Sequence, residues 1–146
     1  MKNQIINKTG WIIVILNVLA ILNATWYFLG MAKFPFQGWI FFNACTPSIV
    51  LFLIGFLLKN SYVMSASLPF LLYFGGGGLF VFSWTGTSVI AQVSHILMVL
   101  SASYVVAFIL VNKFGKKWLI GFASGLLLFL LFFAVIAFKA NRSGIR

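Results

Sequence analysis

Residues 62–111 are the feature that most constrains the fold, because about fifty consecutive residues carry no formal charge. An α-helix rises about 1.5 Å per residue, so one helix of this length would far exceed a hydrocarbon core of roughly 30 Å. The stretch must therefore fold back on itself. A cluster of turn-forming residues at 84–88 is the best place for the break. This predicts two membrane spans, at residues 62–83 and 88–111.

The composition places the remaining apolar stretches in a membrane as well. Hydrophobic residues make up 63% of the 146-residue chain and charged residues 7%, against roughly 45–50% and 25% in soluble domains. Further spans are expected at residues 10–31, 38–58 and 118–138. A short turn containing Pro35 makes the first two spans antiparallel neighbours. The sequence thus predicts an all-α integral membrane protein, a single polytopic domain built as a bundle of five transmembrane helices.

An alternative topology keeps four spans and makes residues 62–83 a re-entrant segment, because Pro69 and four consecutive glycines weaken that helix. Both topologies divide the cationic residues six to four between the two sides, so charge counting does not separate them. With five spans, the six lie on the N-terminal side, which weakly favours a cytoplasmic N-terminus. These six are Lys2, Lys8, Lys59, Lys113, Lys116 and Lys117.

The charge balance excludes several kinds of chemistry. The chain has ten Lys and Arg residues but no Asp or Glu, for a net charge of +10. The chain alone therefore cannot supply carboxylate catalysis, a carboxylate proton relay or a site for a hard cation. A single cysteine, Cys45, permits neither an intramolecular disulfide nor a zinc-binding cysteine pair, so no metal site is expected.

The basic residues instead predict contacts with membrane lipids through their anionic headgroups, or with an acidic partner subunit. No nucleic-acid partner is expected, because the charges are scattered over short loops. The residues expected to make these contacts are Lys113, Lys116, Lys117, Lys139 and Arg142.

A polar stripe marks the fourth predicted span. At 100° per residue, Ser88, Gln92, His95 and Ser103 fall within about 80° of arc. Such a stripe must face protein or water, because unpaired polar groups in hydrocarbon are costly. It serves either as hydrogen-bonded packing between helices or as the lining of a solute path. Haem or quinone binding at His95 is a further alternative, although a bis-His haem would need a second subunit.

Two other spans carry helix-breaking residues. Asn43, Thr46 and Pro47 lie in the second span, where Pro47 would free the Asn43 carbonyl and kink the helix. Pro69 would do the same in the third span, shortly before Gly75, Gly76, Gly77 and Gly78. In transporters, interrupted helices expose unpaired backbone carbonyl and N–H groups at the binding site. Proline and glycine in membrane helices also allow close helix packing. On the first span, Asn17 and Thr25 are candidates for facing hydrogen bonds.

A G-x-x-x-G pattern on the last span, formed by Gly121 and Gly125 with Ser124 beside them, predicts close helix packing. The partner helix belongs either to the same chain or to a second copy in a homo-oligomer.

The function favoured by these patterns is a small membrane transport protein or permease subunit for a neutral, anionic or amphiphilic solute. Its path is expected along Asn43, Thr46, Ser88, Gln92 and His95, beside the four glycines. The alternative is a non-catalytic anchor or accessory subunit of a larger membrane complex, possibly a respiratory one. An intramembrane enzyme is least favoured, because no nucleophile lies beside a recognisable base and Ser94 points away from His95.

Overall fold

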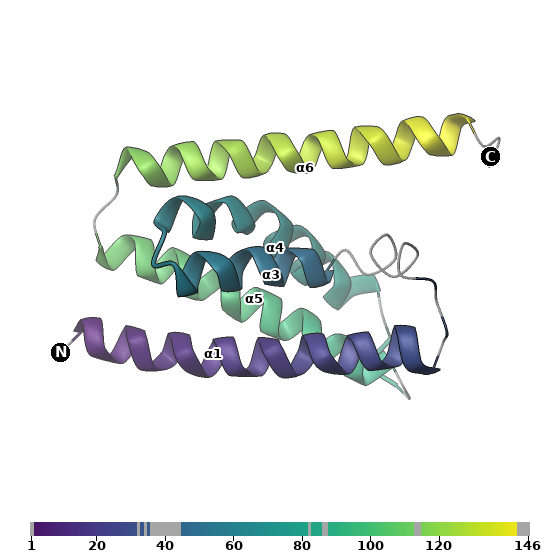
Figure 1. Cartoon of the computed structure of the whole chain (residues 1–146), viewed down its shortest axis with the longest axis horizontal. Coiled ribbons are helices and arrows are strands. Elements are labelled where there is room, and N and C mark those ends of the chain that lie inside the picture. The colour runs from purple at the N-terminus through teal and green to yellow at the C-terminus, as the bar shows by residue number, and fades with distance from the viewer. Residues whose placement is uncertain are drawn as a thin grey trace.

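The computed structural model describes residues 2–31, 33, 35, 45–81, 83–85, 88–112 and 115–142, and every regular element in these ranges is helical (Figure 1). The first helix is α1 (Lys2–Thr25), which continues into a π-helical turn, η1 (Trp26–Met31). The others are α3 (Cys45–Leu57), α4 (Ser61–Val81), α5 (Ser88–Val111) and α6 (Lys116–Arg142).

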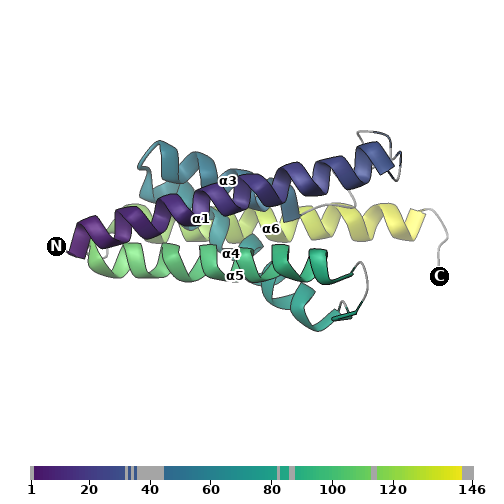
Figure 2. The ribbon, with the colours of Figure 1, turned by 90° about the horizontal axis from the view of Figure 1, so that it is seen from below.

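Successive helices run in alternating directions. The N-terminus, the α3–α4 turn and the α5–α6 connection lie at one end of the bundle, and the α4–α5 connection lies at the other (Figures 1 and 2). Lys8, Lys59, Lys116 and Lys117 belong to the first of these ends, and all four side chains are exposed. We call this the basic end.

Four helices are long and apolar enough to cross a membrane: Asn7–Thr25, Ser61–Val81, Ala91–Val111 and Lys116–Phe138. The described part of α3 has 13 residues and is about 20 Å long at 1.5 Å per residue, shorter than a bilayer core. Most of the remaining predicted second span, including Asn43, lies outside the described residues. The all-helical, membrane-compatible class is therefore confirmed.

The third predicted span is a single helix. α4 is continuous from Ser61 to Val81, through Pro69 and the four glycines, and is long and apolar enough to cross a membrane. The main-chain oxygen that Pro69 leaves without an N–H partner belongs to Ser65, which is fully buried. Burial of this part of α4 by its neighbours stabilises a sequence that would be a poor helix in isolation.

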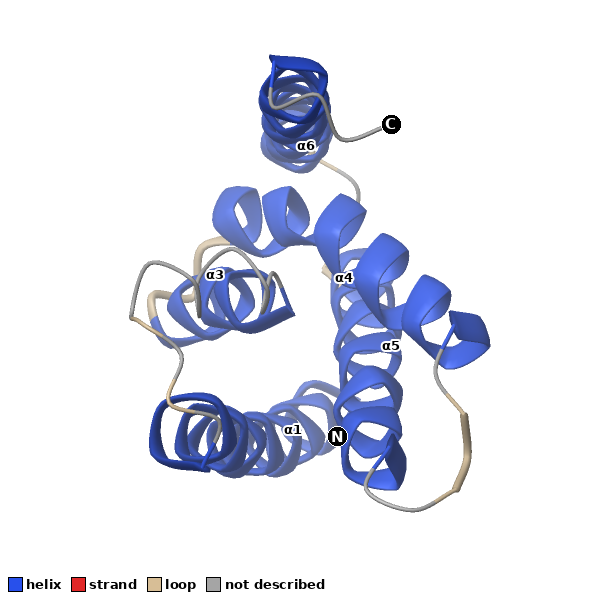
Figure 3. Cartoon of the chain, turned by 90° about the vertical axis from the view of Figure 1, so that its right-hand side faces the viewer, coloured by secondary structure: helices blue, strands red, loops and turns tan. Residues whose placement is uncertain are grey.

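α4 is the central helix, since it packs against α3, α5 and α6, whereas α1 packs against α5 and α3 (Figure 3). The largest fully buried apolar side chains come from α3, α4 and α5; they are Phe52, Met64, Leu71, Met98 and Val105. The outward faces of α1 and α6 are mostly exposed and apolar. In a membrane these faces would contact lipid.

The glycines of α6 bring it close to α4 within the same chain. A β-carbon built on Gly121 would overlap the Ser65 hydroxyl and the Tyr62 carbonyl, and one on Gly125 would overlap the Ala66 carbonyl. Ser124 beside them is half-buried. Farther along, the α4 rings Phe70, Tyr73 and Phe74 pack against the α6 rings Phe129, Phe132 and Phe133. The chain's own α4 thus occupies the glycine face.

Candidate functional site

Polar side chains from distant parts of the sequence meet where the start of α3, the second half of α4 and the first half of α5 come together. We call this group the polar junction: Cys45 of α3, Gly78 and Leu79 of α4, and Gln92 and His95 of α5. Gln92 and His95 are 0% and 5% exposed. Because polar groups are costly inside an apolar bundle, each needs an identifiable contact.

His95 lies between α3 and α4. Its Nε2 is 3.6 Å from Sγ of Cys45, a distance at which a thiol and an imidazole form a weak hydrogen bond. On another side the ring meets the α4 backbone at Gly78, where a β-carbon would overlap the imidazole. Only glycine allows α4 and the ring to approach this closely.

Gln92 joins α5 to the last turn of α4. Its Nε2 donates a hydrogen bond of 3.4 Å to the carbonyl oxygen of Leu79. α4 ends at Val81, so this carbonyl is one of the last four, which have no partner within the helix. The side chain therefore satisfies a backbone group that the helix end leaves open.

The four glycines divide into two pairs with different surroundings. Gly75 approaches Met98 and Val99 of α5, and Gly78 approaches His95, whereas β-carbons on Gly76 and Gly77 would meet open space. Positions 75 and 78 lie three residues apart and share a helix face. Two of the four glycines thus bring α4 against α5, and the other two do not line the junction.

Three further residues were expected along the solute path, and the structure describes the side chain of only one of them, Thr46. Thr46 is buried in the first turn of α3, where it directly follows Cys45 and precedes Pro47. Asn43, whose carbonyl Pro47 was expected to free, lies outside the described residues. Ser88 is the first residue of α5, and its side chain is not among those that the structure describes.

The predicted polar stripe does not extend to Ser103, which is exposed and donates back to the Val99 carbonyl at 2.9 Å. The buried serine of this region is Ser101. The reason is that α5 changes neighbours along its length: its first half packs on α4 at the glycines, and its second half packs on α1 and α3. A single straight face therefore cannot remain buried throughout.

Ser101 takes part in the polar contact of the second half of α5. Asn17 of α1 donates from Nδ2 to Ser101 Oγ and to the Ile13 carbonyl, both at 2.8 Å, and Ser101 Oγ donates to the Leu97 carbonyl at 2.7 Å. Both side chains are fully buried. This chain of short bonds fixes α1 against α5.

Cys45 is the residue of the polar junction that sequence reasoning missed. It lies 50 residues from His95 along the chain, and no spacing rule relates the two. Together they would supply two metal ligands, and the chain holds no other Cys, His, Asp or Glu to complete a site. A haem iron would reach Nε2 only if α3 and α4 moved away from the ring.

Two of the residues predicted to contact headgroups lie within the described part of the chain. Lys116 and Lys117 are exposed in the first turn of α6, at the basic end. Lys113 lies outside the described residues, as do the side chains of Lys139 and Arg142 near the end of α6.

Comparison with known proteins gives no match: no protein-family model, curated protein or solved structure is significantly similar to this chain. The function must therefore be argued from the residues themselves.

Proposed function

We propose that this chain is a small multi-pass membrane transport protein in which a neutral, anionic or amphiphilic solute passes beside the polar junction. The observation that carries the proposal is the burial of Gln92 and His95 against the glycine-opened face of α4. Ionisable side chains inside a membrane are expensive to keep and usually mark a pathway. Cations are poor candidates for the cargo, because the chain has no carboxylate to attract them.

Two contacts at the junction support this assignment. The bond from Gln92 to the Leu79 carbonyl is 3.4 Å long, beyond the usual 2.7–3.2 Å of a strong N–H···O bond. His95 lies against a thiol, which is a weak hydrogen-bonding group. A passing polar solute would compete for these two contacts at a small cost.

The test is an osmotic swelling assay on proteoliposomes, with a panel of neutral polyols and monovalent anions. We expect His95→Ala to lower permeation about tenfold or more for the transported member of the panel, while the chain remains folded by circular dichroism. Ser103→Ala is the matched control, because it removes a hydroxyl from an exposed position on the same helix. Equal permeation by native chain and His95→Ala would refute the path at His95.

An accessory subunit is the second candidate, and α6 is the observation that favours it. This helix packs mainly against α4 and leaves most of its apolar surface uncovered. Native mass spectrometry of the gently extracted chain decides between the two functions. Stoichiometric co-purification of a second subunit that contains Asp and Glu residues supports the accessory role. An isolated chain with permeation activity supports transport.

A further inference from the structure

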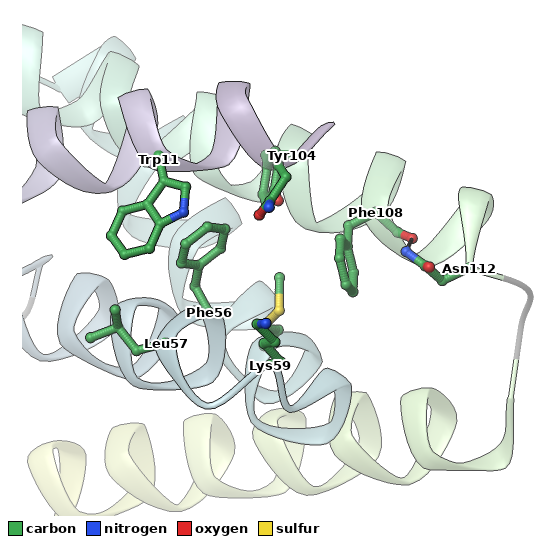
Figure 4. A pocket seen from close by; sticks show the side chains of 9 residues that line it. Trp11, Phe56, Leu57, Lys59, Tyr104, Phe108 and Asn112 are labelled. Carbon is green, nitrogen blue, oxygen red and sulfur yellow. Dashed lines mark hydrogen bonds between the residues drawn. The ribbon is translucent and has the colours of Figure 1, made fainter. Parts of the chain in front are cut away.

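A cavity opens at the basic end, away from the polar junction. It has a volume of about 480 Å³, within the roughly 300–1,000 Å³ typical of ligand pockets. Its aromatic walls come from three helices: Trp11 of α1, Phe56 of α3, and Tyr104 and Phe108 of α5 (Figure 4). The rings pack on one another, with centroids 5.4 Å apart for Trp11 and Phe56 and 5.9 Å for Phe56 and Tyr104. The cavity is thus apolar and built on helices.

Cationic and amide side chains border this apolar space. Lys59 and Asn112 line the cavity, and both are exposed. A second cavity of about 220 Å³ shares Phe108 and Asn112 with the first and is lined by Lys116 and Lys117. Three lysines therefore surround two adjoining cavities, and the chain contains no carboxylate to neutralise them.

The backbone at Lys59 is unusual for a lysine. Its φ is 50°, in the left-handed region that glycine normally occupies after a helix. Lys59 N–H donates to the Phe56 carbonyl and Asn60 N–H to the Gly55 carbonyl, at 3.0 and 2.9 Å, which closes α3 with a Schellman motif. Asn60 then caps α4, since its Oδ1 accepts from the Tyr62 N–H at 3.0 Å. A glycine would suit position 59 better, so the turn holds a lysine at a conformational cost.

We propose that these cavities bind one anionic membrane phospholipid, with acyl carbons against the aromatic walls and the phosphate between Lys59 and the lysines of α6. The position suits such a ligand, because the basic end is where the helices finish and where headgroups of a surrounding bilayer would lie. Charge complementarity selects an anion, and the apolar walls select one that carries a hydrocarbon chain. This inference is independent of the proposed transport path.

The experiment is native mass spectrometry of the full chain, released from micelles that contain phosphatidylglycerol and phosphatidylcholine in equal amounts with the same acyl chains. We expect retained phosphatidylglycerol to exceed phosphatidylcholine. Lys59→Gly should lower that preference about fivefold, the change that corresponds to one lysine near an anionic headgroup. Because glycine relieves the left-handed backbone, this variant should unfold at or above the temperature of the native chain.

Lys33→Gly is the matched control. Lys33 also has a left-handed backbone, with φ of 51°, but follows α1 at the end opposite to the cavities. Its replacement removes the same charge and the same backbone cost, and it should leave the lipid preference unchanged. An equal loss in both variants, or equal retention of the two lipids by the native chain, would overturn the site.

A competition experiment separates a lipid from a free anion. A large excess of inorganic phosphate, or of glycerophosphoglycerol without acyl chains, should fail to displace phosphatidylglycerol. Displacement by either compound would show that the cavities recognise the anion alone, and would contradict the lipid assignment.

Discussion

The two halves of α5 hold their polar residues in different ways. In the second half, Ser101 is joined to Asn17 and to the Leu97 carbonyl by bonds of 2.8 and 2.7 Å, beside the packed rings of Phe52 and Tyr104. In the first half, Gln92 donates to the Leu79 carbonyl at 3.4 Å, and His95 lies 3.6 Å from the Cys45 thiol and against Gly78. Both halves bury their polar side chains, but the second half joins two side chains by a short bond between helices, whereas the first half places its side chains against a helix end, a thiol and a glycine. Burial alone therefore does not describe how a polar side chain is held.

The largest expected effect comes from closing the gap that glycine leaves in the first half. A side chain at position 78 would overlap the His95 ring, whereas one at position 77 would meet open space. Gly78→Leu should therefore destabilise the fold by roughly 1–3 kcal/mol through overpacking. Gly77→Leu should be neutral or stabilising by up to about 1 kcal/mol through helix propensity. Unfolding by SDS in mixed micelles measures both, and equal effects would mean that the glycine pairs are not distinct.

An intermediate effect is expected in the second half. A double-mutant cycle with Asn17→Ala and Ser101→Ala should give a coupling free energy of about 0.6 kcal/mol, and at most about 1.7, as for other hydrogen bonds between membrane helices. The same unfolding assay supplies the four stabilities. Strictly additive losses would show that the 2.8 Å bond does not stabilise α1 against α5.

The smallest effect should come from Ser103, which shares α5 with both polar groups but lies on its exposed side. Ser103→Ala removes only a bond to the Val99 carbonyl of its own helix, so its stability should stay within about 0.5 kcal/mol of the native chain. A larger loss would place Ser103 in an interior contact and restore the straight polar stripe.

The sequence predicts the helical class and several boundaries well, because long apolar runs leave few alternatives. The expected fourth span, 88–111, coincides with α5, and the third, 62–83, is close to α4 at Ser61–Val81. The outer helices extend past the prediction, since α1 begins at Lys2 and α6 ends at Arg142. Hydropathy marks the apolar portion of a helix, whereas backbone hydrogen bonding continues into polar residues.

The candidate site is less predictable because it depends on which helices meet. The periodicity of α5 groups Gln92 and His95 correctly but adds Ser103, since an angular projection assumes one neighbour along the whole helix. Cys45 becomes part of the site only through the packing of α3 on α4 and α5. Likewise, nothing in the run of four glycines shows that the first and last approach α5.

The glycine contact between α6 and α4 also bears on the order in which the protein is made. α6 is synthesised after α4, so the receiving face of α4 is in place before α6 arrives. The Ser65 side chain on that face already has a hydrogen-bond partner within α4, because its Oγ donates to the Tyr62 carbonyl at 2.9 Å. This hydroxyl therefore does not depend on the arrival of α6 for a partner, which matters in lipid, where an unpaired hydroxyl is costly.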